Sequence, residues 1–226
     1  EPFRIPEDWT IYNTLDYGLD MFAHYKVAIS NDNIAYVFHE IYQSGLIISD
    51  AAAKVKVAEL HEKEDGSVEH WYKPKLRLAP PDLWNRSQET GKSRALLFYE
   101  NGLELVKSNN DRHAGWLAIK ELLKERVAPN GETYTRLKIF RTCTNLIRTL
   151  PQLLIDEKDP EDAAKEPHEL THAPDALRYF AIYWTQPPQP KAPKKVKYRP
   201  DILEDYLNAS EEERQIIIKR YGVPLL

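Results

Sequence analysis

Residues 9–42 read WTIYNTLDYGLDMFAHYKVAISNDNIAYVFHEIY, and this stretch decides the fold. It holds three runs suited to β-strands: residues 9–16, which end at Tyr17-Gly18, residues 22–30, which alternate apolar and polar, and residues 34–42, which are aromatic and β-branched. Such runs, separated by turn residues such as the NDN at 31–33, are typical of strands in short hairpins. The stretch therefore predicts three consecutive antiparallel strands.

Helical and strand patterns alternate downstream of residue 42. Helices are predicted at residues 49–62 (closed by a charged turn at 64–67), 111–126, 145–154 and 172–184, with a helix-permissive stretch at 82–100. Short apolar runs predict strands at residues 74–79, 103–106 and 134–140. This order suits an α/β fold with a mixed central sheet and helices on both faces. That pattern alone permits many functions.

The chain divides into three parts. Residues 1–8 read as the end of an inter-domain linker, since the sequence opens EPFRIPEDW without an initiator methionine, and we expect a longer protein. Residues 9–184 form the α/β domain. Residues 185–226 begin with TQPPQPKAPKKVKYRP, whose prolines disfavour regular structure and whose lysines keep it in water. A last amphipathic helix is predicted at about residues 201–220.

The composition excludes several classes of protein. An apolar content of 42% supplies an ordinary core, and the single cysteine, Cys143, excludes an internal disulfide and suits a reducing compartment. No apolar run approaches the roughly 20 residues of a membrane helix, so we expect a cytosolic protein with no membrane partner. A net charge of −4 argues against coating nucleic acid through bulk electrostatics. The net charge does not argue against an enzyme that acts on DNA, because bound divalent metals and basic loops reverse the electrostatic potential where the substrate binds.

Acidic residues stand at the ends of predicted elements. Two-metal phosphodiester cleavage needs such carboxylates to converge around two Mg²⁺ or Mn²⁺ ions about 3.5 to 4 Å apart. Asp16 ends the first strand, where the alternative is a turn-forming aspartate. Asp82 follows the fourth strand, where the alternative is a helix N-cap. Asp175 shares one face of its helix with His172 and Tyr179.

Glu40 is a fourth candidate, inside the run YVFHEIY. Strict alternation places it on one layer with Phe38 and Tyr42, opposite the layer of Val37 and Ile41. An acid between aromatic residues on a buried layer needs a cation or a metal as its partner. A salt bridge or an exposed face is the alternative.

His168 and His172 are spaced i and i+4, which suggests a zinc pair. A closed zinc site has four ligands, and the sequence holds no cysteine cluster to complete one. We therefore favour the carboxylate interpretation over a zinc site.

Six motifs together resemble the C-terminal nuclease domain of phage large terminases over about residues 9–184. They are LDYG (15–18), YVFHEIYQSG (36–45), APPDLWNR (79–86), GLELVKSNNDRHAGW (102–116), KIFRTCTNLIRTLP (138–151) and, above all, HAPDALRY (172–179). The resemblance implies a ribonuclease-H-like sheet, in which three antiparallel strands are followed by parallel strands. It also implies an endonuclease that uses two Mg²⁺ or Mn²⁺ ions.

The resemblance assigns the acidic metal cluster to Asp16, Asp82 and Asp175, and places His172 beside it as a proton or phosphate partner. Glu40 would be a further ligand or a group that supports one. The fourth-strand acid of the family often follows an alanine directly, whereas in this chain Pro80 follows Ala79. The family also often has an acid just before the helix histidine, where this chain has Thr171. The second ligand is therefore either Asp82 or Glu40.

Basic residues near these acids are candidates for contacts with the DNA backbone: Arg86, Lys92, Arg94, Lys107, Arg112, His113 and Arg178. Phosphate contacts of this kind position the protein without reading sequence. A solvated surface is the alternative for the loop cations, and pairing with Asp175 is the alternative for Arg178. Trp84 and Trp116 follow apolar spacing, and we predict that they belong to the core.

The resemblance also names partners: double-stranded DNA, an upstream ATPase domain of the same polypeptide, the portal protein and the small terminase subunit, all in the host cytoplasm. No Walker A motif occurs in this chain. Two other functions stay open, a resolvase-like or other ribonuclease-H-fold nuclease acting on branched or hybrid substrates, and a non-catalytic DNA- or portal-binding module. For the Pro/Lys stretch and the last helix, three interpretations stay open. They dock on the portal or the motor, they add non-specific affinity for DNA, or they form a disordered tail.

Overall fold

The computed structural model describes residues 1–62, 68–70, 73–186 and 195–224. The chain forms two compact units, Glu1–Thr185 and Gln186–Leu226. The charged turn predicted at residues 64–67 and most of the Pro/Lys stretch lie outside the described residues. Within the described part of the chain, no helix is long and apolar enough to cross a membrane.

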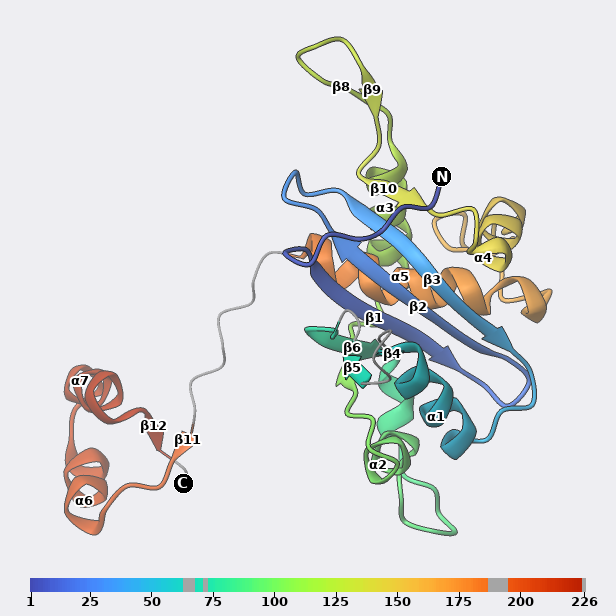
Figure 1. The fold of residues 1–226 in the computed structure, drawn as a ribbon. Coiled ribbons are helices and arrows are strands. Elements are labelled where there is room, and N and C mark those ends of the chain that lie inside the picture. The colour runs from blue at the N-terminus through green and yellow to red at the C-terminus, as the bar shows by residue number, and fades with distance from the viewer. Residues whose placement is uncertain (63–67, 71–72, 187–194, 225–226) are drawn as a thin grey trace. The chain divides into compact units, whose positions relative to one another are not determined.

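A mixed sheet forms the centre of the first unit (Figure 1). Among the described residues it has six strands, in the order β10-β3-β2-β1-β6-β7. They are β1 (Thr10–Tyr17), β2 (Phe22–Ile29), β3 (Ala35–Gln43), β6 (Leu76–Ala79), β7 (Val106–Lys107) and β10 (Leu137–Ile139). β1, β2 and β3 pair antiparallel, whereas β6, β7 and β10 each run parallel to their neighbours β1, β6 and β3. The expected ribonuclease-H-like sheet is confirmed.

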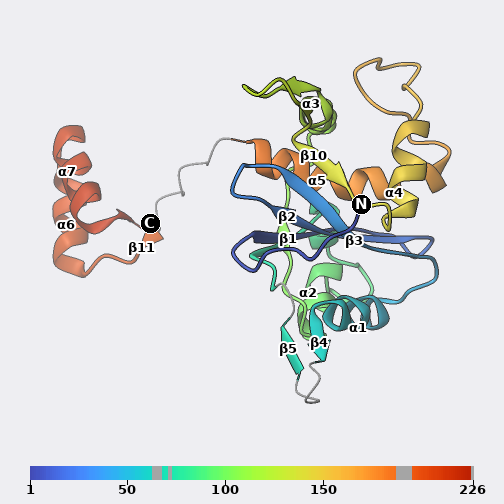
Figure 2. The same cartoon turned by 45° about the horizontal axis from the view of Figure 1, so that its top comes forward.

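Helices cover both faces of this sheet, as predicted (Figure 2). One face carries α3 (Arg112–Leu123), α4 (Thr144–Thr149) and α5 (His172–Thr185), and the other carries α1 (Ile48–Ala58) and α2 (Arg94–Glu100). Each side has its own apolar cluster, one around Tyr25 and Phe180 and the other around Phe22 and Phe98. Burial of this apolar surface is the main term that stabilises the unit.

The position of α5 matters most for function. The helix packs against β1 and β2, and Thr14 in β1 donates its hydroxyl hydrogen bond to the backbone oxygen of Ala176 at 2.5 Å. The first turn of α5 therefore lies beside the end of β1. The helix predicted at residues 172–184 is confirmed to within one residue.

The faces of β3 differ from the sequence prediction. The register of β3 against β2 shifts within the strand and leaves Phe38 as an extra, unpaired residue. Val37 and Tyr42 consequently pack on the α5 side, whereas Phe38 and Ile41 pack on the opposite side. The prediction that Val37 and Ile41 share a layer is wrong, because a β-bulge adds one residue and exchanges the faces beyond it.

The remaining elements are short, and they show that two predicted helices have other bounds. They are β4 (Leu60–Glu62), β5 (Val68–His70), β8 (Arg126–Val127), β9 (Thr133–Tyr134), η1 (Pro81–Trp84), η2 (Leu150–Gln152), η3 (His168–Leu170), β11 (Lys195–Val196), α6 (Pro200–Asn208), α7 (Glu211–Tyr221) and β12 (Val223–Pro224). The helix predicted at 49–62 ends at Ala58, because residues 60–62 pair with β5. The helix predicted at 201–220 is two helices, because a capping box between Ser210 and Glu213 starts α7.

Candidate active site

Asp16 lies near the end of β1, between β2 and β6 in the sheet. Gly18 follows it, and the Gly18 N–H donates a hydrogen bond to Met21 O at 2.9 Å, so the chain turns directly after the aspartate. The Asp16 side chain is 18% exposed, and its Oδ2 lies 2.7 Å from His172 Nδ1. The carboxylate is thus held by the first residue of α5 and is still open to solvent on one side.

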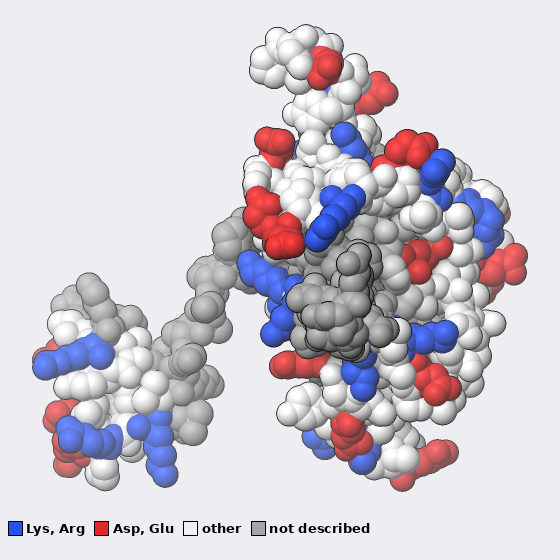
Figure 3. All heavy atoms as spheres, viewed as in Figure 1, with Lys and Arg blue, Asp and Glu red and all other residues white. Residues whose placement is uncertain are grey.

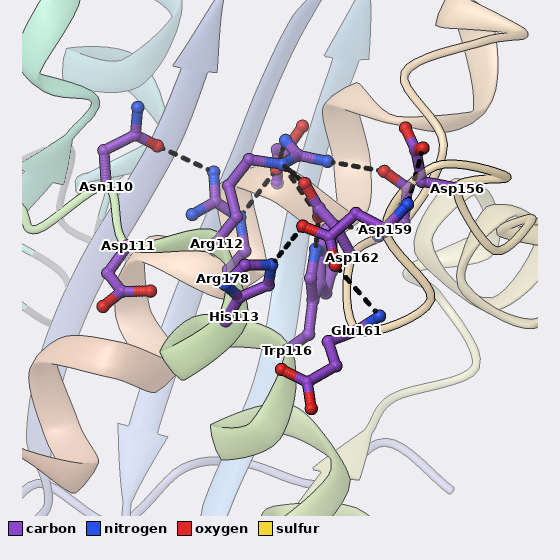
Figure 4. Close-up of polar contacts among 12 residues, drawn as sticks. Asn110, Asp111, Arg112, His113, Trp116, Asp156, Asp159, Glu161, Asp162 and Arg178 are labelled. Atoms are coloured by element: carbon purple, nitrogen blue, oxygen red, sulfur yellow. Dashed lines mark hydrogen bonds and ion pairs between the residues drawn. The ribbon is translucent and has the colours of Figure 1, made fainter.

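Asp175 lies one turn into α5 and is held by two guanidinium groups. Its Oδ1 accepts hydrogen bonds from Arg178 Nε at 2.8 Å and from Arg112 Nη1 at 3.3 Å. Arg112 is held in turn by Asp162, whose two oxygens lie 2.9 and 2.8 Å from Arg112 Nε (Figure 4). Asp175 Oδ2 accepts no hydrogen bond from the residues that the structure describes, so this oxygen can bind a ligand.

Two residues of α3 make this network possible. Trp116 donates its Nε1 hydrogen bond to Asp162 Oδ1 at 2.7 Å, and its ring lies 5.6 Å from the Arg112 guanidinium carbon and 5.4 Å from that of Arg178. A Cβ on Gly115 would overlap Cγ of Arg178, so only glycine lets the arginine pass α3 there. Trp116 is 6% exposed, which confirms its predicted place in the core.

Asp82 lies in η1, three residues after the end of β6. Its side chain is 54% exposed, and its Oδ2 lies 3.6 Å from Arg94 Nη1. Pro80 is the N-cap residue of η1, and no side chain caps that helix, so the N-cap interpretation of Asp82 is wrong. Because β6 runs parallel to β1, with Leu78 level with Thr14, both strands end at the same edge of the sheet.

The three aspartates gather at this edge. Burial raises the pKa of Asp16, the hydrogen bond with His172 lowers it, and the negative charges of Asp175 and Asp82 raise it again. Burial also raises the pKa of Tyr179, followed by the charges of Asp16 and Asp175. Charges have such effects only over short distances. The structure therefore brings the predicted site residues Asp16, Asp82, Asp175 and His172 together from β1, η1 and α5.

Glu40 does not join this group. The sheet register places it opposite Tyr25 in β2, which is itself opposite Thr14 in β1, so the whole of β2 lies between β1 and Glu40. Its carboxylate accepts hydrogen bonds from Asn145 N at 3.0 Å and Leu146 N at 2.9 Å, in the first turn of α4. A helix N-terminus favours a carboxylate in this way. Glu40 shares a layer with Tyr42 as predicted but not with Phe38, and its partner is a helix rather than the aspartates.

Arg178 is a correction to the predicted DNA contacts. Its side chain is 1% exposed, and Nη2 donates a hydrogen bond to Asn110 Oδ1 at 3.0 Å while Nε binds Asp175. The guanidinium therefore cannot reach a DNA phosphate, and the alternative pairing with Asp175 is the one that the structure shows. Arg112 is 22% exposed and is bound to Asp162 and Asp175.

The other predicted DNA contacts lie on the surface. Lys92 Nζ lies 2.8 Å from Glu100, and His113 Nε2 lies 2.7 Å from Asp159. Lys107 Nζ lies 5.3 Å from the centroid of the Trp84 ring, and Arg86 and Arg94 are exposed. On the face shown in Figure 3, basic and acidic side chains are interspersed. The described surface on this side thus has no continuous basic band.

Sequence reasoning missed Asp20 and Asp162. Asp20 Oδ2 lies 2.9 Å from His172 Nε2, on the side of the imidazole opposite Asp16. The signal for Asp20 was the histidine pair at 168 and 172, which needs an acidic partner. Asp162 lies in the connection between η2 and η3, where no periodic pattern marks its contact with Arg112.

The titration of His172 predicts how stability depends on pH when EDTA removes divalent metals. Burial lowers the pKa of the imidazole, but the hydrogen bonds to Asp16 and Asp20 raise it to about 8, from 6.5. Because the folded protein binds this proton more tightly than the unfolded chain, the stabilisation is complete below pH 6.5 and is lost as the pH rises through about 8.

We expect the free energy of unfolding to fall by about 1 to 2 kcal/mol over that interval. Urea unfolding in EDTA at several pH values, with wild type beside His172→Gln, measures it. The variant should show a flatter profile between these limits. Parallel profiles would contradict the prediction.

No protein-family model and no curated protein matches the chain, but solved structures do. The P22 large terminase nuclease domain matches with a TM-score of 0.58 at 17% identity, over 81% of this chain and 85% of that one. The large terminase of a thermophilic bacteriophage matches with a TM-score of 0.54 at 17% identity, over 79% of this chain and 41% of that one. The large terminase nuclease of another thermophilic phage, G20c, with bound magnesium, matches with a TM-score of 0.50 at 10% identity, over 80% of this chain and 83% of that one.

Sheet order and these likenesses define the class of fold as that of ribonuclease-H-like nucleases. More particularly, the chain has the fold of the nuclease domains of large terminases. It spans less than half the length of the second of these three terminase chains.

Proposed function

We propose that this chain is the metal-dependent endonuclease domain of a viral terminase large subunit, which cuts concatemeric double-stranded DNA during packaging. The observation that supports this most directly is that Asp16, Asp82 and Asp175 lie at one sheet edge, where the negative charges of Asp175 and Asp82 raise the pKa of Asp16. The cations near these carboxylates leave oxygens free: Arg112 and Arg178 bind one oxygen of Asp175, and Arg94 lies 3.6 Å from one oxygen of the half-exposed Asp82.

In this proposal, Asp16, Asp82 and Asp175 bind a pair of Mg²⁺ or Mn²⁺ ions. Both ions prefer carboxylate oxygens, and mutual repulsion among the three aspartates is relieved when a cation binds. Asp175 offers Oδ2, and Asp82 is open to solvent. Bound ions would activate a water molecule and stabilise the leaving oxygen, giving a 3′-hydroxyl and a 5′-phosphate.

The surrounding residues position these ligands. His172 Nδ1 holds Asp16, and Arg112 and Arg178 fix the plane of Asp175. His172 is 5% exposed, so it acts through its protons rather than by binding a phosphate. The exposed cations Arg86, Lys92, Arg94, Lys107 and His113 would contact the DNA backbone.

The proposal includes further partners. An upstream ATPase domain of the same polypeptide would drive packaging, and the portal protein and small terminase subunit would bind the assembled motor in the host cytoplasm. The match to a large terminase of which this chain spans 41% supports the longer polypeptide.

Digestion of plasmid DNA tests the function and decides between Asp82 and Glu40. We expect cutting in Mn²⁺ or Mg²⁺ and none in EDTA. Asp82→Asn should lower the rate at least about tenfold, because it removes one charged ligand. Glu40→Gln should cut at nearly the wild-type rate and lose about 1 kcal/mol of stability, as expected for a weakened helix cap.

Each other outcome has a meaning. If Asp82→Asn cut DNA at the wild-type rate and Glu40→Gln did not cut it, Glu40 would be the second ligand. Preference for four-way junctions over linear duplexes would favour the resolvase-like function. Absence of cutting together with absence of Mn²⁺ binding would favour a non-catalytic binding module.

A further inference from the structure

A second group of metal-binding side chains lies beside the aspartates. Asp20 follows β1, His168 lies in η3, and His172 begins α5. Asp20 Oδ2 lies 2.9 Å from His172 Nε2 and also 2.9 Å from His168 Nδ1. One ligand atom from each residue lies within 4.8 Å of the other two. Two imidazoles and a carboxylate thus converge on one point.

The orientation of His172 prepares it as a metal ligand. Its Nδ1 lies 2.7 Å from Asp16 Oδ2 and takes the proton of that hydrogen bond in a neutral imidazole. When a metal displaces the proton that Nε2 shares with Asp20, the lone pair lies on Nε2, which faces Asp20 and His168. A histidine that donates one N–H to a carboxylate while its other nitrogen binds a metal is the usual arrangement in protein metal sites.

Two further features suit the binding of an ion. The Asp20 and His168 side chains are 54% and 58% exposed, so an ion can enter and keep water on its open side. A Cβ on Gly18 would overlap Asp20 Oδ1 and lie 3.4 Å from His172 Cε1. The φ angle of Gly18 is not in the left-handed region, so space rather than backbone conformation calls for glycine here.

We propose that Asp20, His168 and His172 bind one divalent transition metal of the Zn²⁺ or Co²⁺ class. Imidazole nitrogen is a good ligand for these ions and a poor one for Mg²⁺, which prefers oxygen. Three protein ligands and an open position match zinc sites that retain a water molecule. The site shares no ligand with the oxygen-only cluster of Asp16, Asp82 and Asp175. It does not depend on the proposed nuclease function.

Titration of the 226-residue chain with Zn²⁺, followed by calorimetry in excess Mg²⁺, tests this site. We expect His168→Ala to weaken Zn²⁺ binding at least about tenfold, the lower end of losses seen when groups around a metal are removed. The matched control is His113→Ala, another exposed histidine paired with an aspartate. It should bind as the wild type does, and so should Asp82→Asn.

A spectroscopic measurement shows which atoms bind. In ¹⁵N NMR of the histidine rings, Zn²⁺ should shift His168 Nδ1 and His172 Nε2 and leave His113 unchanged. Equal Zn²⁺ affinity in wild type and His168→Ala would overturn the proposal and leave the three side chains as a hydrogen-bonded cluster. Loss of binding in Asp82→Asn, but not in His168→Ala, would also overturn it, because the ion would then occupy the aspartate cluster.

Discussion

Asp16→Asn is expected to lower the rate of metal-dependent DNA cleavage at least about a thousandfold, or about 4 kcal/mol of transition-state stabilisation. Asp16 is on the central strand, is held by His172, and has both other aspartates close enough to raise its pKa. Asparagine keeps the size of the side chain and one oxygen. It loses the charge that would attract both ions.

The rate should be measured at saturating Mn²⁺, so that weaker metal binding and slower chemistry are separated. The matched control is Asp32→Asn, an exposed aspartate in the turn between β2 and β3, for which we expect wild-type cutting. Melting curves of both variants establish that they fold. A rate for Asp16→Asn within tenfold of wild type would remove Asp16 from the metal site.

Local sequence patterns predicted the parts of the fold that depend on local physics. The three antiparallel strands and α5 come from runs of alternating or helically spaced apolar residues, and such runs bury one face whatever lies around them. The exchanged faces of β3 could not be predicted, because the bulge at Phe38 depends on pairing with β2. The β8–β9 hairpin is too short for any period to show.

The residues of the candidate site also divide into those that local sequence indicated and those that only the tertiary structure brings together. Asp16 and Asp175 stand in short motifs at element ends, which made them candidates, and the family resemblance implied that they meet. Glu40 was a reasonable candidate until its partner was known, since the first turn of α4 is more than 100 residues away in the chain. Asp162 contributes through Arg112 from an irregular segment. Only the tertiary structure pairs such residues.

Arg178→Met should have the largest effect on stability among substitutions near the site, about 3 to 5 kcal/mol. The Arg178 side chain is 1% exposed and binds Asp175 and Asn110, so the volume that methionine fills is similar but the two polar partners lose their donors. Removing one member of a buried ion pair leaves the other charge without compensation. In this case Arg112 compensates only in part, at 3.3 Å from Asp175.

Urea unfolding of a double-mutant cycle isolates the interaction. Asp175→Asn in the Arg178→Met background should cost less than in the wild type, because the uncompensated charge disappears with it. The surface control is Arg4→Met, whose ion pair with Glu7 is more than 80% exposed on both sides and should contribute little. Additive effects of the two substitutions at positions 175 and 178 would show that Arg178 stabilises through packing on Trp116. The buried ion pair would then not be what holds Asp175 in place for its metal.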